Sequence, residues 1–144
     1  MERIKRIHEN LADQKAHYKQ EWKQVGDKRI FARSKWEYKY AVYLQTLKES
    51  GDIKDWEHEP EEFWFDKIKR GVRSYKPDFR VIHKNDATEY VEVKGYMDAK
   101  SKTKIKRMKI YHPQIKLRVV DGEWFKSNGK ALKILVAGFE DKIK

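Results

Sequence analysis

Asp78, Glu92 and Lys94 have the types and the spacing that metal-assisted hydrolysis needs. Asp78 opens one predicted strand, and Glu92 and Lys94 lie two residues apart on the next strand, across a predicted hairpin. Because residues i and i+2 of a strand share a face, Glu92 and Lys94 should project together, whereas Val91 and Val93 should pack on the other side. Two carboxylates beside an ammonium group can bind a divalent cation and hold a water molecule for attack on phosphate.

The alternative for these three residues is a set of ion pairs at the edge of a sheet. Such surface pairs are common and contribute about 0–1 kcal/mol each. The valines on either side of Glu92 predict a central strand, buried on one face. A charged face on a central strand needs a functional reason, so the sequence favours the catalytic interpretation.

The elements that must position these residues follow from the apolar periodicity. A polar helix with a thin apolar stripe is predicted over residues 1–24. A second helix begins after the N-cap Ser34 and stops at Gly51, and a basic helix covers residues 100–111. Strands are predicted at residues 63–65, 78–83, 89–94, 115–119 and 132–136.

Glu37 has two interpretations. It lies three residues after Ser34, where a capping box would place it. It also lies beside the apolar face of the second helix, from which it could reach a site at the sheet. Both roles stay open at this point.

These elements predict an α/β (α+β) fold with a mixed central sheet of about five strands, flanked by helices. The strand–helix–strand unit from residue 89 to residue 120 predicts two parallel strands with a right-handed connection. We expect a helical extension over residues 1–32 and one main domain over residues 33–144.

Composition restricts the class of protein. The chain has 144 residues, a net charge of +11 and no cysteine. Disulfides and thiolate metal sites are therefore excluded, and no apolar run approaches the ~20 residues that cross a bilayer. The N-terminus lacks the apolar region of a secretory signal, so we expect a cytoplasmic location. The positive charge favours an anionic polymer as partner.

The positive charge is concentrated near the predicted site. Eight Lys or Arg residues and no acidic residue lie between Ala99 and Arg118. A mere solubilising face is the alternative to binding a nucleic-acid backbone. The candidate DNA contacts are Lys100, Lys102, Lys104 and Arg107 on the basic helix, with Arg70, Arg73 and Lys76 ahead of Asp78.

The remaining motifs are weaker candidates for a functional site. The acidic run 52–62 is expected to be a solvated loop, with a second metal site as the alternative, in which Glu57 and Glu59 would be minor ligands. The five histidines lack paired spacing, and none is expected to be catalytic. Trp124 and Phe125 are expected to pack under the last strand, with base stacking as the alternative. No glycine-rich phosphate loop indicates a nucleotide cofactor.

The chain resembles the PD-(D/E)xK nuclease superfamily, in particular small phage-encoded endonucleases, over roughly residues 33–120. The similar motifs are Ser34-Lys35-Trp36-Glu37, Glu59-Pro60, Tyr75-x-Pro77-Asp78-Phe79 and Tyr90-Val91-Glu92-Val93-Lys94-Gly95. The resemblance implies a restriction-endonuclease-like core and hydrolysis of DNA with Mg²⁺, for which Mn²⁺ would substitute.

The resemblance also assigns roles. Asp78 would bridge metal ions, Glu92 and the carbonyl of Val93 would complete the ligands, and Glu37 would bind metal directly or through water. Lys94 would orient or deprotonate the attacking water.

A single small catalytic domain is similar to the Holliday junction resolvases, which implies a homodimer, branched DNA as substrate and, for a phage protein, the host cytoplasm. The helix at residues 1–24 is the expected dimer element. The alternatives are a restriction-type, transposase-type or general nicking nuclease, a non-catalytic DNA-binding module of the same fold, and a basic RNA-binding structural protein.

Overall fold

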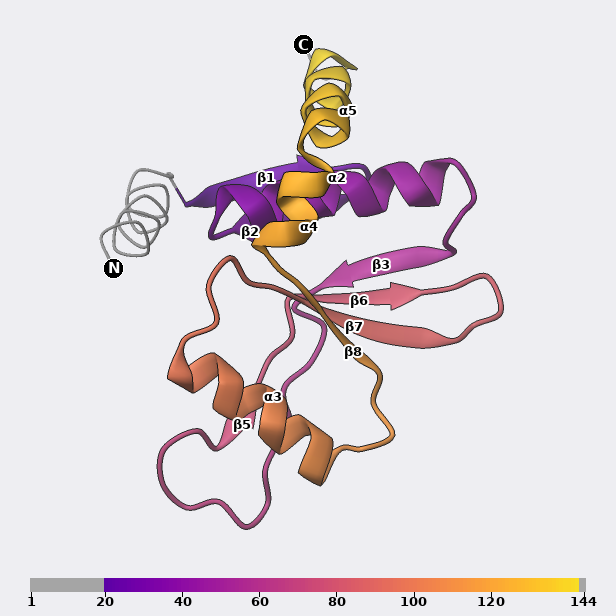
Figure 1. The fold of residues 1–144 in the computed structure, drawn as a ribbon. Helices are drawn as coiled ribbons and strands as arrows, with labels where there is room; N and C mark the ends of the chain where they lie inside the picture. The colour runs from indigo at the N-terminus through magenta and orange to yellow at the C-terminus, as the bar shows by residue number, and fades with distance from the viewer. Residues whose placement is uncertain (1–19, 143–144) are drawn as a thin grey trace, which may run out of the picture.

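A four-stranded mixed sheet forms the centre of the protein (Figure 1). The computed structural model describes residues 20–142. The strands are ordered β3 (Asp55–His58), β6 (Phe79–Ile82), β7 (Thr88–Val93) and β8 (Leu117–Val120). The first three are antiparallel neighbours, and β8 runs parallel to β7 after the crossover helix α3 (Ala99–Tyr111). The expected α/β class and the expected parallel pair are confirmed.

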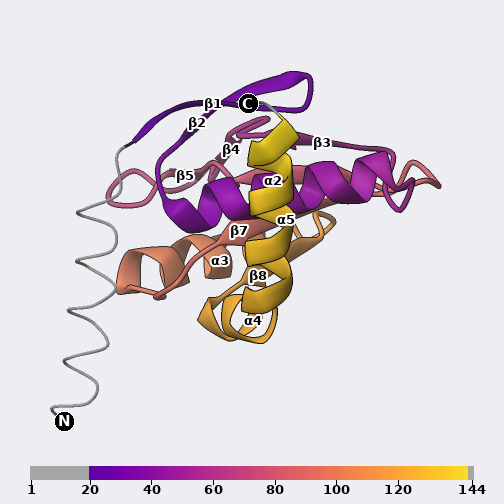
Figure 2. The same ribbon diagram turned by 90° about the horizontal axis from the view of Figure 1, so that it is seen from above.

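Two small β-pairs and three more helices surround this sheet. β1 (Glu21–Val25) pairs with β2 (Lys28–Ala32), and β4 (Phe63–Trp64) pairs with β5 (Ser74–Tyr75). The helices are α2 (Lys35–Glu49), α4 (Gly122–Ser127) and α5 (Gly129–Lys142). Figure 2 shows α5 crossing α2, against which it packs. No helix within residues 20–142 has both the length and the apolar character needed to cross a membrane.

Alternating side chains on the sheet build a core on each face. Val91 and Val93 of β7 join the larger core beneath α2, whereas Tyr90 joins a smaller core with β4, β5 and α3. β6 shows the same alternation, because Phe79 and Val81 are both buried in the larger core. The alternation fixes the register, since a slip by one residue would turn Val91 and Val93 to the opposite face.

The second helix begins as its capping signal predicts. The Ser34 hydroxyl accepts a hydrogen bond from the Glu37 N–H at 3.1 Å. Tyr40 and Leu44 then repeat at helical spacing and are almost fully buried. Gly51, with a φ of +81°, follows the C-cap residue, and its left-handed backbone suits glycine.

Two expected elements are wrong, and both errors concern short apolar segments. Residues 21–25 form strand β1 and not the end of a helix, because the Gly26-Asp27 break is the turn of a hairpin. The rest of the expected helix, with its dimer role, lies outside the described residues, so the boundary at residue 32 stays a prediction. Residues 132–136 lie in α5, where Leu132, Val136 and Phe139 share a helical face against the core.

The acidic run is also partly structured. β3 lies within it as an edge strand of the main sheet, so the expectation of a loop over the whole run is wrong. The apolar residues among the acids explain this, because Ile53 and Trp56 are buried in the larger core. The main sheet has four strands where about five were expected: β4, within residues 63–65, belongs to a separate pair, residues 132–136 are helical, and β3 joins the sheet instead.

A close contact after β7 joins the sheet to α2. A Cβ placed on Gly95 would lie 2.3 Å from Cζ3 of Trp36, far inside van der Waals contact. The Trp36 ring cannot retreat freely, because it stacks on Phe125 with centroids 4.6 Å apart. Gly95 therefore allows the end of β7 to approach the first turn of α2.

We expect Gly95→Ala to destabilise the fold by about 1–3 kcal/mol, the usual cost of overpacking a filled site. The measurement is the free energy of unfolding in urea. Gly138→Ala is the matched control, because a Cβ on this α5 glycine meets nothing within 4 Å. The control should be neutral or stabilising by up to about 1 kcal/mol. Equal stability of the two variants would contradict this account of Gly95.

Candidate active site

The antiparallel register of β6 and β7 brings the two predicted carboxylates together. Phe79 pairs with Val91, so Asp78 at the entry to β6 lies at the level of Glu92. The Asp78 carboxylate accepts a hydrogen bond from the Val93 N–H at 2.8 Å. Just after the end of β7, the Lys94 N–H donates a hydrogen bond to the Val120 carbonyl at 2.9 Å, which fixes the end of β7 against β8.

A residue of the smaller core holds the Glu92 carboxylate. The Tyr75 hydroxyl of β5 donates a hydrogen bond to the Glu92 carboxylate. Burial, followed by the neighbouring Glu92, raises the pKa of Tyr75 above its usual range, so the hydroxyl remains a donor. The Tyr75 ring is itself buried among Phe63, Phe65 and Met108, which gives this donor a fixed position.

The carboxylates are close enough to perturb one another. Burial raises the pKa of Asp78 well above its usual range, and the charges of Glu92, Glu37 and Glu59 raise it further. The hydrogen bond from Val93 acts in the opposite direction. Burial also raises the pKa of Glu92, whereas Tyr75, Lys94 and Lys104 oppose the shift. Lys94 and Lys104 therefore lie near enough to Glu92 to offset its charge.

Glu37 takes part in this site through its side chain. Its N–H bonds Ser34, as a cap residue should, but its carboxylate contacts Nε2 of His58 on β3. The side chains of Glu37 and His58 are only 8% and 7% exposed. The Ser34 cap therefore uses only the backbone N–H of Glu37, and the Glu37 carboxylate, on which a capping box would depend, contacts His58 instead.

Glu59 connects this helix contact to Asp78. Its N–H donates to the backbone carbonyl of Asp78 at 2.7 Å, and its carboxylate pairs with Arg33. Ligand atoms of Glu37, His58 and Glu59 all lie within 4.8 Å of one another. Glu59 has a φ of +46°, an uncommon backbone state outside glycine that often occurs at functional sites.

The donor set fits a hard divalent cation. Mg²⁺ and Mn²⁺ prefer carboxylate and carbonyl oxygens. Glu37 and Glu59 supply carboxylates in the cluster with His58, and Asp78 and Glu92 lie outside that cluster but near enough to Glu37 for their charges to interact. A divalent cation would also relieve the mutual repulsion that raises the pKa of Asp78. The imidazole of His58 adds a donor that suits Mn²⁺ and other transition metals better than Mg²⁺.

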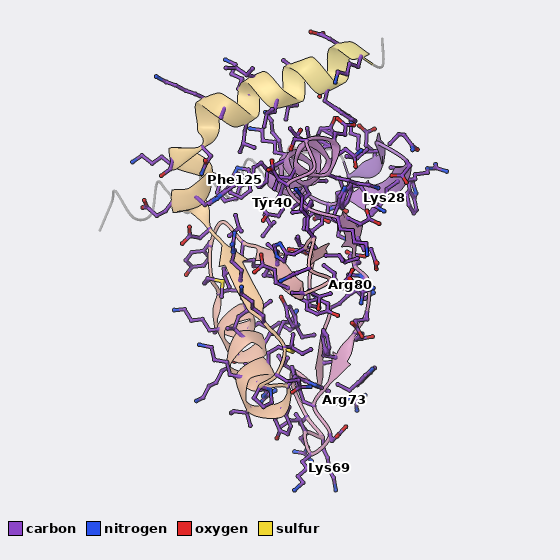
Figure 3. All side chains as sticks on the ribbon, turned by 90° about the vertical axis from the view of Figure 1, so that its right-hand side faces the viewer. Lys28, Tyr40, Lys69, Arg73, Arg80 and Phe125 are labelled. Atoms are coloured by element: carbon purple, nitrogen blue, oxygen red, sulfur yellow. The ribbon has the colours of Figure 1, made fainter. Side chains whose placement is uncertain are left out.

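The expected DNA contacts fall into separate groups. Lys100 and Lys102 are exposed on α3, and Lys104 faces Glu92 closely enough to lower its pKa. Arg107 instead donates to the backbone carbonyl of Val72, which gives it a structural contact within the fold. The three residues of the second group, Arg70, Arg73 and Lys76, are exposed. Figure 3 shows Lys69 and Arg73 of that loop at the end of the molecule away from α5.

Sequence reasoning missed His58 as a member of the site. The histidines have no paired spacing along the chain, whereas His58 meets Glu37 from a different element, 21 residues away. Its position directly before Glu59-Pro60 was the available signal. Trp124 and Phe125 pack at the larger core, but not under a strand as expected, because residues 132–136 are helical; Phe125 stacks on Trp36 and Trp124 contacts Tyr40, both of α2.

The sequence model of one family, described as "Protein of unknown function (DUF1064)", matches residues 16–134, more than half of the chain. The chain belongs to the DUF1064 family. No curated protein and no solved structure gives a significant match. All candidate site residues of this DUF1064 chain lie within the matched segment.

We expect Asp78→Asn to stabilise the metal-free DUF1064 chain at neutral pH, because it removes a partly buried charge among like charges. The melting temperature in chelator should rise by about 3 °C, the shift that roughly 1 kcal/mol gives in a domain of this size. The folded protein binds the Asp78 proton more tightly than the unfolded chain does. Wild-type stability should therefore fall as pH rises from the usual Asp pKa through the raised one, and the variant should lack this fall.

Magnesium provides the control for this prediction. Added Mg²⁺ should raise the melting temperature of the wild type and leave that of Asp78→Asn nearly unchanged, since only the wild type holds the full ligand set. A variant that is less stable than the wild type at every pH would contradict the account of Asp78 as a repelled buried charge.

Proposed function

We propose that the chain is a metal-dependent endonuclease that hydrolyses DNA phosphodiester bonds, with Mg²⁺ as the cofactor and Mn²⁺ as a substitute. The observation that carries the proposal is the register that sets Asp78 and Glu92 side by side, both partly buried, with Lys94 near enough to Glu92 to lower its pKa. Burying adjacent carboxylates is costly without a cation. A protein that only bound DNA would gain nothing from carboxylates that face phosphate.

The roles of the residues follow from their positions. Asp78, Glu92 and the carbonyl of Val93 would hold the metal, and Glu37 would bind it directly or through water. The bound cation supplies Lewis acidity that makes a water molecule more acidic and offsets charge on the phosphate. Lys94 would orient that water or take its proton, and the Tyr75 hydroxyl would keep Glu92 in place.

The order of elements supports the resemblance to PD-(D/E)xK nucleases. A helix bearing Glu37 is followed by antiparallel strands bearing Asp78 and Glu92, then by a crossover helix and a parallel strand. This is the context in which that pattern of residues would be catalytic. The positive side chains of α3 follow Lys94 directly, where they could bind the DNA backbone.

Within this class we propose a branched DNA, in particular a four-way junction, as the preferred substrate, cut by a homodimer. Two symmetric nicks require two active sites, which a dimer supplies. This step rests on similarity to the resolvases, whereas the nuclease itself rests on the site.

The experiment compares cleavage of a labelled four-way junction with that of a linear duplex of the same sequence, in Mg²⁺ and in chelator. Lys94→Ala should keep its DNA affinity and lose cleavage by about 10²-fold or more, because it removes the group that acts on the water. Lys84→Ala is the matched control, since this exposed lysine lies in the turn between β6 and β7, at the other end of the strands.

The cleavage pattern distinguishes a junction resolvase, a general nuclease and a DNA-binding module. Paired nicks in the junction alone, lost in Lys94→Ala and retained in Lys84→Ala, would support a resolvase. Equal cutting of both DNAs would keep the nuclease and remove the junction preference. Tight DNA binding without cutting of either substrate would contradict the nuclease and leave a binding module.

A further inference from the structure

The outer face of the β1–β2 hairpin carries two aromatic side chains, the exposed Trp22 and the half-buried Phe31. The two strands pair Trp22 with Phe31, and Gln24 with Arg29. The inner face contributes Val25, Ile30 and Ala32 to the larger core, so the hairpin is anchored without the outer face. Trp22 is 57% exposed, an unusual position for so large an apolar ring. The hairpin thus presents an aromatic surface that has no structural task.

Cationic side chains cover this aromatic surface. The Arg29 guanidinium lies 5.0 Å from the centre of the Trp22 ring, and that of Arg33 lies 5.2 Å from the centre of the Phe31 ring. The two rings are 5.5 Å apart. Aromatic rings interleaved with arginines are the usual composition of surfaces on which unpaired bases stack while their phosphates meet positive charge.

A depression connects this surface to the candidate site. It measures about 610 Å³, a size common for small-ligand pockets. Trp22, Phe31 and Arg29 line it at the hairpin, and His58 and Glu59 line it at β3. Because Glu59 also bonds the Asp78 carbonyl, a nucleotide in this depression would lie next to the proposed metal ligands.

Arg29 is the lining cation that can bind the phosphate of an occupant. Lys28, Arg29 and Arg33 line the depression together with Glu57 and Glu59. Ion pairs engage most of these groups, since Glu57 pairs with Arg80, Glu59 pairs with Arg33 and Lys28 pairs with Asp55. Arg29 keeps an exposed position over the Trp22 ring.

We propose that the outer face of the β1–β2 hairpin binds an unpaired nucleotide of the DNA substrate, with its base stacked on Trp22 and its phosphate held by Arg29. A duplex cannot fill this site, because its bases stack on one another and expose only their edges in the grooves. The inference rests on the proposed nuclease function and deepens it. It names as substrate a DNA with unpaired nucleotides beside the cleaved phosphate, as occurs at a branch or a strand end.

The test measures binding of a fluorescent single-stranded DNA and of a matched duplex to the full chain in chelator. Trp22→Ala should weaken single-strand binding by about ten-fold and change duplex binding by less than about two-fold. Trp22→Phe should restore most of the loss, since phenylalanine also stacks. Trp64→Ala is the matched control, because Trp64 is 53% exposed on β4 and does not line the depression.

Salt dependence tests the phosphate contact. Arg29→Ala should lower the slope of log affinity against log salt for the single strand by about 0.7, the value for one phosphate contact. Equal effects of Trp22→Ala and Trp64→Ala, or equal loss of single-strand and duplex binding, would overturn the proposal. At least ten-fold tighter binding to RNA of the same sequence would overturn the assignment to DNA.

Failure of the proposed function would look different. A wild type that binds single-stranded DNA through Trp22 but cuts no DNA would keep this inference and remove the nuclease. If the wild type cuts DNA and Trp22→Ala keeps full activity on every branched substrate, the nuclease stands and the inference is overturned.

Discussion

The hydrogen bond from the Val93 N–H to the Asp78 carboxylate is the contact on which the candidate site depends. It joins the entry of β6 to the end of β7, at the point where the two strands carry their acids. It is also a favourable interaction for an ionised Asp78 in a setting that otherwise penalises the charge. The rest of the site surrounds Asp78 and Val93. Glu59, directly after β3, donates to the Asp78 carbonyl, and His58 at the end of β3 contacts Glu37 of α2.

The site is therefore assembled from elements that are distant in sequence and held by different cores. Val91 and Val93 anchor the site strand in the larger core, whereas Tyr75 reaches Glu92 from the smaller one. The Val93 N–H, the Tyr75 hydroxyl and nearby lysines offset part of the charge of these two partly buried, neighbouring carboxylates. Such a stability cost at a site is typical where function, and not folding, determines the residues.

Much of this arrangement could be predicted from the sequence, because it follows from strand geometry. The alternation of side chains along a strand places Glu92 on the opposite face from Val91 and Val93, and the cap residue Ser34 marks the start of α2. The contact of His58 with Glu37 could not be predicted, since it depends on how an edge strand packs beneath a helix. Short apolar segments gave wrong predictions for a related reason. The segment from Leu132 to Val136 is too short for its apolar periodicity to distinguish a strand from a helix.

The central claim is that the paired carboxylates of Asp78 and Glu92 hold a divalent cation, and calorimetric titration of Mn²⁺ into wild type and Glu92→Gln tests it most directly. Glutamine keeps an oxygen that can accept from the Tyr75 hydroxyl, so the fold should persist while one anionic ligand is lost. The account predicts saturable Mn²⁺ binding to the wild type and binding at least about ten-fold weaker in Glu92→Gln. Equal binding in both proteins, or none in the wild type, would contradict it.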